Sequence, residues 1–243
     1  MKIEVFRNAE CVALHAAKHI AEAARTAVAT RGKFAIALSG GKTPWIMLDH
    51  LAHENVPWKA VHIFQVDERI APLGDADRNL THLRESLLRQ APLRAEQIHA
   101  MPVESEDLDA ACTRYALTLE DAAGSPPVLD LVHLGLGPDG HTASLVPGDP
   151  VLGVVDADVA LTGTYQGRRR MTLTYPIINR SRLVLWLVTG GEKAEMLSRL
   201  RAGDISIPAG RVCSNFSVVL ADQDVATQLD RNSKTDLRPA SEQ

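Results

Sequence analysis

Short apolar runs alternate with helix-like segments along most of this chain, and this alternation constrains its fold more than any other feature. The apolar runs are Phe34–Leu38, Val61–Val66, Leu129–Leu136 and Leu183–Val188. The helix-like segments that follow them are residues 43–52, 78–90, 141–145 and 192–200. A strand that is apolar at nearly every position is buried on both faces, which is typical of a parallel sheet covered by helices. The pattern therefore predicts an α/β fold, a mostly parallel sheet with helices on both faces.

The remaining segments predict two further helices and a small antiparallel element. Residues 8–31 are Ala-rich and amphipathic, with Asn8 suited to cap the helix and Gly32 suited to end it. Residues 104–123 predict another helix. Residues 159–175 alternate polar and apolar side chains, which predicts a β-hairpin or an antiparallel addition to the sheet.

Length and composition favour a single domain. The chain has 243 residues, of which 45% are hydrophobic, enough for one well-packed α/β domain. It contains no internal repeat and no obvious linker, so we expect one domain over residues 1–243. Its last residues, about 229–243, are polar and are expected to form a flexible tail.

Charge and cysteine content exclude several classes of protein. The 26 Lys and Arg against 30 Asp and Glu give a net charge of −4, so there is no overall basic field for nucleic acid. The three cysteines lie far apart, without metal-ligand spacing, which suits a reducing compartment. No apolar run approaches the roughly 18 residues of a membrane span. We therefore expect a cytoplasmic protein that binds neither nucleic acid nor membrane.

The candidate functional residues follow the predicted strands. In open α/β sheets, ligands bind beyond the carboxyl ends of the strands. Four segments stand at such ends: residues 39–43, 67–69, 137–141 and 189–193. Arg69, His141 and Lys193 stand in three of them, beside glycines or carboxylates, which predicts one shared active site at this edge of the sheet.

The segment Ser39-Gly40-Gly41-Lys42-Thr43 resembles a nucleotide P-loop but lacks an essential glycine. A P-loop needs glycine five positions before the second glycine of its motif, and Ile36 stands there. A glycine-rich turn that leads into a helix still offers N–H groups and a positive helix end to a phosphate. We interpret the segment as a phosphate-binding turn of another kind.

The segment around His141 suggests acid–base chemistry. Residues 135–140 match the dinucleotide fingerprint, but Pro147 interrupts the helix that this fingerprint requires. Asp139 and His141 instead stand together at a strand end, with His141 at or near the expected start of a helix. A helix N-terminus disfavours imidazolium and a neighbouring carboxylate favours it, and the sequence leaves open which prevails. Either way, a neutral His141 could accept a proton there.

Four other cationic side chains are candidates for the same site. Arg69 ends the run Asp67-Glu68-Arg69, directly after a buried strand. Strand alternation predicts that Arg168 and Arg170 share a face that looks onto a polar cleft. Lys193 stands at a predicted helix start, where a bound phosphate would relieve its repulsion by the helix dipole.

Taken in order, five of these segments resemble the 6-phosphogluconolactonase family. They are ALSGGKTP, VDERIAP with Asn79 following, LGLGPDGHTASLVPG, RMTLTYPIIN and VTGGEKAEML, within about residues 30–215. The wider superfamily includes glucosamine-6-phosphate deaminases and the sugar-phosphate-sensing domains of some transcription regulators. The resemblance implies a modified Rossmann-like α/β sheet and hydrolysis of 6-phospho-D-glucono-1,5-lactone to 6-phosphogluconate, the second step of the oxidative pentose phosphate pathway.

The resemblance also implies a role for each candidate residue. His141 would be the base that activates water, Asp139 would support it, and Arg69 would contact the substrate or the oxyanion. The residues expected to bind the substrate and its phosphate are Ser39, Gly40, Gly41, Thr43, Asp67, Arg170 and Lys193. The family needs no metal and no organic cofactor. The implied partner is a small sugar-phosphate lactone, and the expected state is a monomer or a small homo-oligomer.

Two related functions are the alternatives. A deaminase of this superfamily has an acidic residue five positions after the corresponding histidine, and Val146 stands there, which cannot transfer a proton. A sugar-sensing regulator has an N-terminal DNA-binding unit, and only about 30 residues precede the first predicted strand. The sequence also departs from the family's usual pattern at Lys42 and Arg78, where small polar residues are common.

Overall fold

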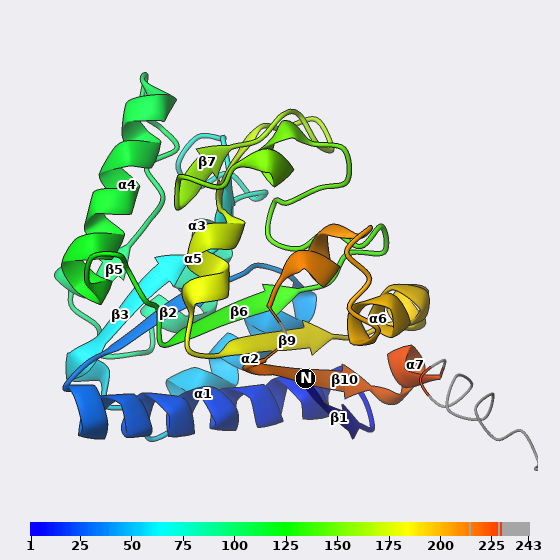
Figure 1. Ribbon diagram of the computed structural model, residues 1–243. Coiled ribbons are helices and arrows are strands. Elements are labelled where there is room, and N and C mark those ends of the chain that lie inside the picture. Colours follow the sequence, from blue (N-terminus) through cyan, green and yellow to red (C-terminus); the bar gives the residue numbers. More distant parts are fainter. Residues whose placement is uncertain (214, 228, 230–243) are drawn as a thin grey trace, which may run out of the picture.

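A parallel sheet of seven strands forms the centre of the computed structural model, which describes residues 1–213, 215–227 and 229 (Figure 1). From edge to edge the strands are β1 (Lys2–Phe6), β10 (Ser217–Asp222), β9 (Val184–Val188), β6 (Leu131–Gly135), β2 (Phe34–Leu38), β3 (Val61–Gln65) and β5 (Ile98–His99). Each neighbouring pair is parallel. The four predicted apolar strands are β2, β3, β6 and β9, and they lie side by side in the sheet. The predicted α/β class is confirmed.

Helices cover both faces of the sheet. They are α1 (Ala9–Arg31), α2 (Lys42–Ala52), α3 (Asn79–Leu83), α4 (Leu108–Ala123), α5 (Tyr175–Arg180), α6 (Ala194–Arg201) and α7 (Gln223–Ala226). Short helical turns lie at η1 (Trp58–Ala60), η2 (Arg84–Leu88), η3 (Ala95–Gln97), η4 (Pro150–Gly153), η5 (Gly191–Lys193) and η6 (Pro208–Arg211). Figure 1 shows α1 beneath the sheet and α4 and α5 above it.

The side chains of β2 show why the sheet needs both helical layers. Phe34, Ile36 and Leu38 pack into the hydrophobic core that holds α1 and α2, whereas Ala35 and Ala37 pack into the core that holds α4, α5 and α6. Successive side chains of a strand point to opposite faces, so a strand that is apolar throughout is buried on both.

A second, antiparallel sheet of three strands lies against the carboxyl ends of the first. Its strands, in order, are β4 (Asp67–Arg69), β8 (Arg170–Leu173) and β7 (Val159–Leu161). The predicted antiparallel addition at 159–175 is therefore confirmed. Gln166 and Gly167 form the turn between β7 and β8, with φ of 50° and 79°, as a tight two-residue hairpin turn requires.

The predicted helix at 141–145 is wrong. These residues form a turn closed by a bridge between Thr142 and Leu145. Gly140 and Ala143, with φ of 82° and 51°, hold the left-handed backbone conformation, which a right-handed helix excludes. His141 therefore stands in a loop and not at a helix start.

Two other predicted helices have different boundaries. The helix predicted from 104 begins only at Leu108, because the Asp107 side chain accepts the Ala110 N–H at 2.9 Å and so fixes the N-terminus there. The segment 78–90 divides into α3 and the π-helical turn η2. The predicted helix 8–31 is confirmed, with Asn8 and Gly32 as its caps.

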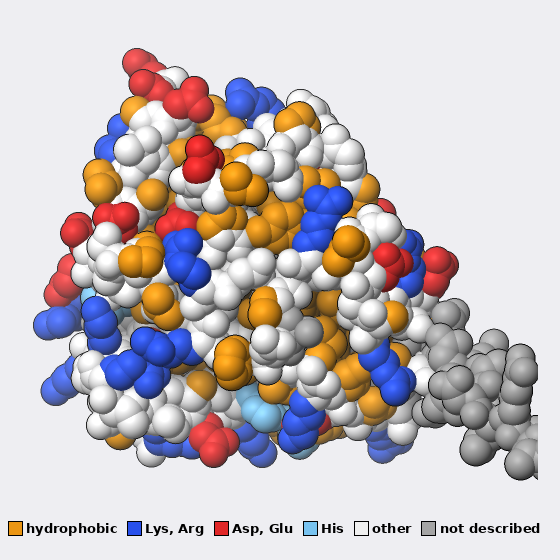
Figure 2. Space-filling model, viewed as in Figure 1, with side chains coloured by type: hydrophobic (Ala, Val, Ile, Leu, Met, Phe, Trp, Pro, Cys, Tyr) orange, Lys and Arg blue, Asp and Glu red, His pale blue; other side chains and the backbone are white. Residues whose placement is uncertain are grey.

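The predicted tail, about 229–243, lies outside the described residues except for Leu229. None of the helices in the described part of the chain has the length and apolarity that crossing a membrane requires. On the face shown in Figure 2, acidic and basic side chains are interspersed among apolar ones. A small anionic ligand could bind in a cleft lined by cationic side chains, such as the one beyond the carboxyl ends of the central strands.

The arrangement of the two sheets determines where such a cleft forms. The loops after β9, β6 and β2 leave neighbouring strands at the same edge of the large sheet. Beside them, the register of the small sheet pairs Arg69 of β4 with Arg170 of β8. Segments far apart in the sequence thus meet at one edge.

Candidate active site

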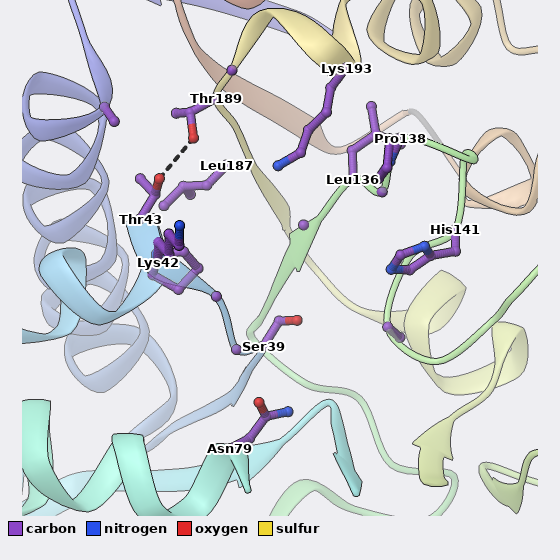
Figure 3. A pocket seen from close by; sticks show the side chains of 18 of the residues that line it. Ser39, Lys42, Thr43, Asn79, Leu136, Pro138, His141, Leu187, Thr189 and Lys193 are labelled. Carbon is purple, nitrogen blue, oxygen red and sulfur yellow. Dashed lines mark hydrogen bonds between the residues drawn. The ribbon is translucent and has the colours of Figure 1, made fainter. Parts of the chain in front are cut away.

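A cleft of about 530 Å³ opens beyond the carboxyl ends of the central strands (Figure 3). Nine of the ten predicted site residues line it: Ser39, Gly40, Gly41, Thr43, Asp67, Arg69, His141, Arg170 and Lys193. The tenth, Asp139, contacts the His141 ring. The structure therefore brings the predicted residues together in one place.

Asp139 determines which nitrogen of His141 can act as a base. The His141 Nδ1 lies 2.5 Å from the Asp139 Oδ1, and the same oxygen accepts the His141 backbone N–H at 3.2 Å. An ionised carboxylate only accepts hydrogen bonds, so Nδ1 must donate to it. The lone pair of the neutral ring is then on Nε2, the nitrogen that can take a proton.

Burial and His141 act in opposite directions on Asp139. Burial raises the pKa of Asp139, but the charge and the hydrogen bonds of His141 outweigh it and leave the pKa below its usual value. Asp139 is therefore ionised at neutral pH. The sequence left open whether a helix dipole or a carboxylate has the greater influence on His141. Because His141 stands in a loop and not at a helix start, the Asp139 carboxylate is the one of the two that is present.

Gly137 leaves room for the imidazole ring of His141. Its N–H donates to the His141 carbonyl at 2.8 Å, which closes the loop. A Cβ on Gly137 would overlap the Nδ1 and Cε1 atoms of His141. Glycine is required here for the close approach of the ring to the backbone.

A hydrogen-bonded chain holds Arg69 in the cleft. The Arg69 guanidinium donates to the side-chain oxygen of Asn79. The amide nitrogen of Asn79 donates to the Asp67 carbonyl at 2.9 Å, and the Ser144 hydroxyl donates to the Asp67 carboxylate at 2.6 Å. Asp67, which we expected to bind substrate, lines the cleft and also anchors this chain.

The buried carboxylate of Glu68 positions Asn79. It accepts the backbone N–H groups of Asn79 and Leu80, each at 2.8 Å, and so caps the start of α3. Arg78, which departs from the usual family pattern, is itself buried beside Glu68 with its Nε at 3.3 Å. Arg78 is thus part of the scaffold beneath the site.

The glycine-rich turn after β2 forms another wall. Gly41, with φ of 134°, is the N-cap of α2, so the first N–H groups of that helix lie at the cleft. A Cβ on Gly40 would overlap the Asn79 side chain. The Ser39 N–H donates to the Nδ1 of the buried His133 at 3.2 Å. Thr43 and Thr189 join this turn to the loop after β9 through hydroxyls 2.8 Å apart (Figure 3).

Two cations complete the cleft. Arg170 is buried on β8, and its Nε has no hydrogen-bond partner among the described residues. Lys193, the last residue of η5, extends into the space between Thr43 and His141 (Figure 3). Both side chains can hold an anion, and an anion on the Arg170 Nε would satisfy a buried donor that lacks a partner.

Arg168 lines a polar cavity together with Arg170, as strand alternation predicted, but it does not line the main cleft. It lies in the hairpin before β8 begins and pairs with Asp75 and Asp77, each at 3.1 Å. The cavity that it lines has a volume of about 300 Å³. Lys42 lines both this cavity and the main cleft.

Sequence reasoning missed several residues of the site. Two of them could have been found from the sequence: Asn79 follows the motif VDERIAP that resembles the family, and Thr189 directly follows a predicted strand. Tyr165, whose hydroxyl lies 3.2 Å from the Asp139 Oδ2, carries no such signal. No group of three or more His, Cys, Asp or Glu side chains in the described ranges is placed to hold a metal ion.

Known proteins are similar to this chain in both sequence and fold. The model of the family described as glucosamine-6-phosphate isomerases/6-phosphogluconolactonase matches residues 7–220. A 6-phosphogluconolactonase of Synechocystis is 39% identical over 180 residues, which are 72% of this chain and 75% of that one. One of Mycobacterium bovis is 36% identical over 241 residues, 93% of this chain and 98% of that one.

A solved structure gives the same result in three dimensions. The 6-phosphogluconolactonase from Trypanosoma cruzi superposes with a TM-score of 0.83 at 28% identity, over 94% of this chain and 96% of that one. The expected modified Rossmann-like fold, the expected family and the expectation of an enzyme are confirmed. This chain belongs to the glucosamine-6-phosphate isomerase/6-phosphogluconolactonase family.

Proposed function

We propose that this chain hydrolyses 6-phospho-D-glucono-1,5-lactone to 6-phosphogluconate in the oxidative pentose phosphate pathway, with His141 as the base that activates water. The observation that carries the proposal is the bond between Asp139 and the His141 Nδ1, at the edge of a cleft lined by Arg69, Arg170 and Lys193. The names of its relatives support the choice of substrate.

The reaction begins at the lactone carbonyl carbon. The water oxygen attacks this carbon while the Nε2 of His141 takes a proton from the water. Negative charge develops on the carbonyl oxygen, and a guanidinium such as that of Arg69 stabilises it. The bond between the carbonyl carbon and the ring oxygen then breaks, and the imidazolium returns its proton to that oxygen. The product carboxylic acid ionises in water.

A lactone is an activated ester, so this mechanism needs no covalent nucleophile. A positioned base contributes roughly 10²–10⁴-fold to such a reaction. The phosphate, remote from the reacting carbon, would bind at the turn 39–43 with Arg170 and Lys193. Its binding energy orients the ring against His141.

The buried position of Val146 favours the lactonase over the related deaminase. Val146 is 7% exposed, and its apolar side chain stands where the deaminase would carry an acid. A deaminase needs that acid to assist ring opening, whereas hydrolysis of a lactone does not. We further propose that the chain acts in the cytoplasm as a single domain and uses no metal or organic cofactor.

The test uses freshly generated 6-phosphogluconolactone and the purified chain. Wild type is expected to accelerate loss of the lactone above its spontaneous hydrolysis, and His141→Ala to lose roughly 10²–10⁴-fold of that acceleration. His53→Ala, an exposed histidine on the end of α2, is the matched control and should keep it. Full acceleration by His141→Ala would remove the proposed base. Preference for the unphosphorylated lactone would overturn the phosphate site.

A further inference from the structure

Tyr165 is fixed at the tip of the hairpin between β7 and β8. Its N–H donates to the Arg168 carbonyl at 3.0 Å, and the Arg168 N–H donates back at 3.2 Å. The left-handed residues Gln166 and Gly167 close the turn between them. Tyr165 is half-buried and contacts His141 and Arg170, two of the residues that line the cleft.

The Tyr165 side chain contacts the Asp139–His141 pair. Its hydroxyl donates to the Asp139 Oδ2 at 3.2 Å, while the Asp139 Oδ1 accepts from His141. Its ring meets the His141 ring edge to face, with centroids 5.5 Å apart and planes at 64°. Edge-to-face packing is a favoured geometry for aromatic rings.

The Tyr165 ring also contacts a cation of the cleft. The Arg170 guanidinium carbon lies 5.1 Å from the ring centroid, within the range of a cation–π contact. One side chain therefore touches both the group that we assign to proton transfer and a group that we assign to anion binding.

We infer that Tyr165 is a positioning residue, whose hydroxyl holds the Asp139 carboxylate in the orientation that directs the His141 Nε2 into the cleft, and whose ring holds Arg170. This inference rests on the proposed function. Each oxygen of the Asp139 carboxylate accepts one hydrogen bond, so the carboxylate cannot rotate without breaking one of the two bonds. Because the carboxylate is fixed, the imidazole that donates to it is also fixed.

Tyr165 keeps the proton that this role requires. Burial raises the pKa of Tyr165, and the neighbouring Asp139 carboxylate raises it further. The hydroxyl therefore stays a donor throughout the neutral range. The hydrogen bond from Tyr165 to Asp139 therefore does not depend on pH near neutrality.

Loss of the hydroxyl would change the basicity of His141 in a defined direction. The hydrogen bond from Tyr165 partly neutralises the charge of the Asp139 carboxylate. Without this bond, the carboxylate stabilises the imidazolium form of His141 more strongly. The pH at which His141 loses its proton should rise. The other charged groups that line the same cleft are Lys42, Asp67, Arg69, Arg170, Glu192, Lys193 and Asp222, and Tyr165→Phe removes none of them.

Two substitutions separate the two halves of the inference. Tyr165→Phe keeps the ring beneath Arg170 and removes the hydroxyl. It should lower kcat roughly 3- to 10-fold and move the acidic limb of the kcat/KM profile up by roughly half a pH unit, with KM unchanged. Tyr165→Leu also removes the ring, so KM should rise in addition.

Tyr175→Phe is the matched control. Its hydroxyl donates to the Pro208 carbonyl at 2.9 Å, away from the cleft, so its removal should move neither kcat nor the pH profile. An NMR titration of the His141 ring in wild type and Tyr165→Phe measures the same shift without activity. An unchanged kcat and an unchanged or lowered His141 titration in Tyr165→Phe would overturn the inference. If wild type were inactive or His141→Ala fully active, the proposed function would fail instead.

Discussion

The backbone at Gly137 leaves no space between itself and the His141 imidazole, which makes this glycine a test of the geometry. Gly137→Ala would place a methyl group against the Nδ1 and Cε1 of His141 and the Oδ1 of Asp139, so both side chains must move. A displacement of about 1 Å at a reacting group can cost roughly 100-fold in rate. We expect kcat/KM for the lactone to fall by about that factor while the protein remains folded.

Gly153→Ala is the comparison for this substitution. Gly153 ends η4, and a Cβ added there meets no atom within 4 Å. Steady-state kinetics and circular dichroism of both variants separate displacement of the ring from general damage. Wild-type kinetics in Gly137→Ala would contradict the assigned position of His141.

Lys193 is expected to act on binding more than on chemistry. Its side chain reaches into the cleft, into the space between Thr43 and His141 (Figure 3). Lys193→Ala should raise KM for the phosphorylated lactone roughly 10-fold or more, with a smaller effect on kcat, because a charge-assisted bond to phosphate is made equally in ground and transition states. Lys59→Ala, an exposed lysine before the amino end of β3, should leave KM unchanged. A fall in kcat alone would instead place Lys193 at the reacting carbonyl.

The residues that could be predicted from the sequence are those whose type is rare at a strand end. His141, Arg69 and Lys193 stand out because cations directly after buried strands need a reason. Tyr165 does not, because its role depends on how far the hairpin folds back over the loop after β6. Strand alternation predicted that Arg168 and Arg170 share a face, but it gave no signal that β8 begins only at Arg170 or that Arg168 pairs with Asp75 and Asp77.

The long helix α1 offers a test at the level of a single element. The Asn8 side chain accepts the Cys11 N–H at 2.9 Å and caps its first turn. Asn8→Ala should lower the free energy of unfolding by about 1 kcal/mol, the usual cost of losing such a cap. Asn8→Asp keeps an acceptor and should restore most of the stability. Equal urea midpoints for wild type and Asn8→Ala would contradict a stabilising cap.

The central strands were predictable and the edge strands were not. A strand buried on both faces is a continuous apolar run, as in Phe34–Leu38. The edge strand β1 carries Lys2 and Glu4, and β5 has only two residues, so neither gives that signal. The helix wrongly predicted at 141–145 is short enough that two left-handed residues, Gly140 and Ala143, decide its backbone.

Acid should destabilise the whole molecule through its buried histidines. Burial lowers the pKa of His133 to about 3, and burial together with His62 lowers that of His99 to about 4. The unfolded chain binds these protons near pH 6.5, whereas the folded chain does not, so stability is full above that pH and falls below it. The slope is roughly 1.4 kcal/mol per pH unit for each proton taken up.

Urea unfolding at pH 7, 6 and 5 measures this dependence. His133→Gln removes one of the two groups and should flatten the slope, whereas His53→Gln, at an exposed site, should not. A protonated His133 would also lose the lone pair that accepts the Ser39 N–H. A free energy of unfolding that stays constant from pH 7 to 5 would contradict the neutral, buried state of His133.

The strands that end at the cleft, β9, β6 and β2, occupy the middle of the sheet, and β1 and β5 are its two borders. Transient fraying at a border breaks no hydrogen bond of the central three. Amide hydrogens of β1 and β5 should therefore exchange with solvent in molecules that are still turning over substrate, whereas exchange in β6 should coincide with complete loss of turnover. We therefore expect the proposed activity to depend on the part of the backbone that exchanges most slowly.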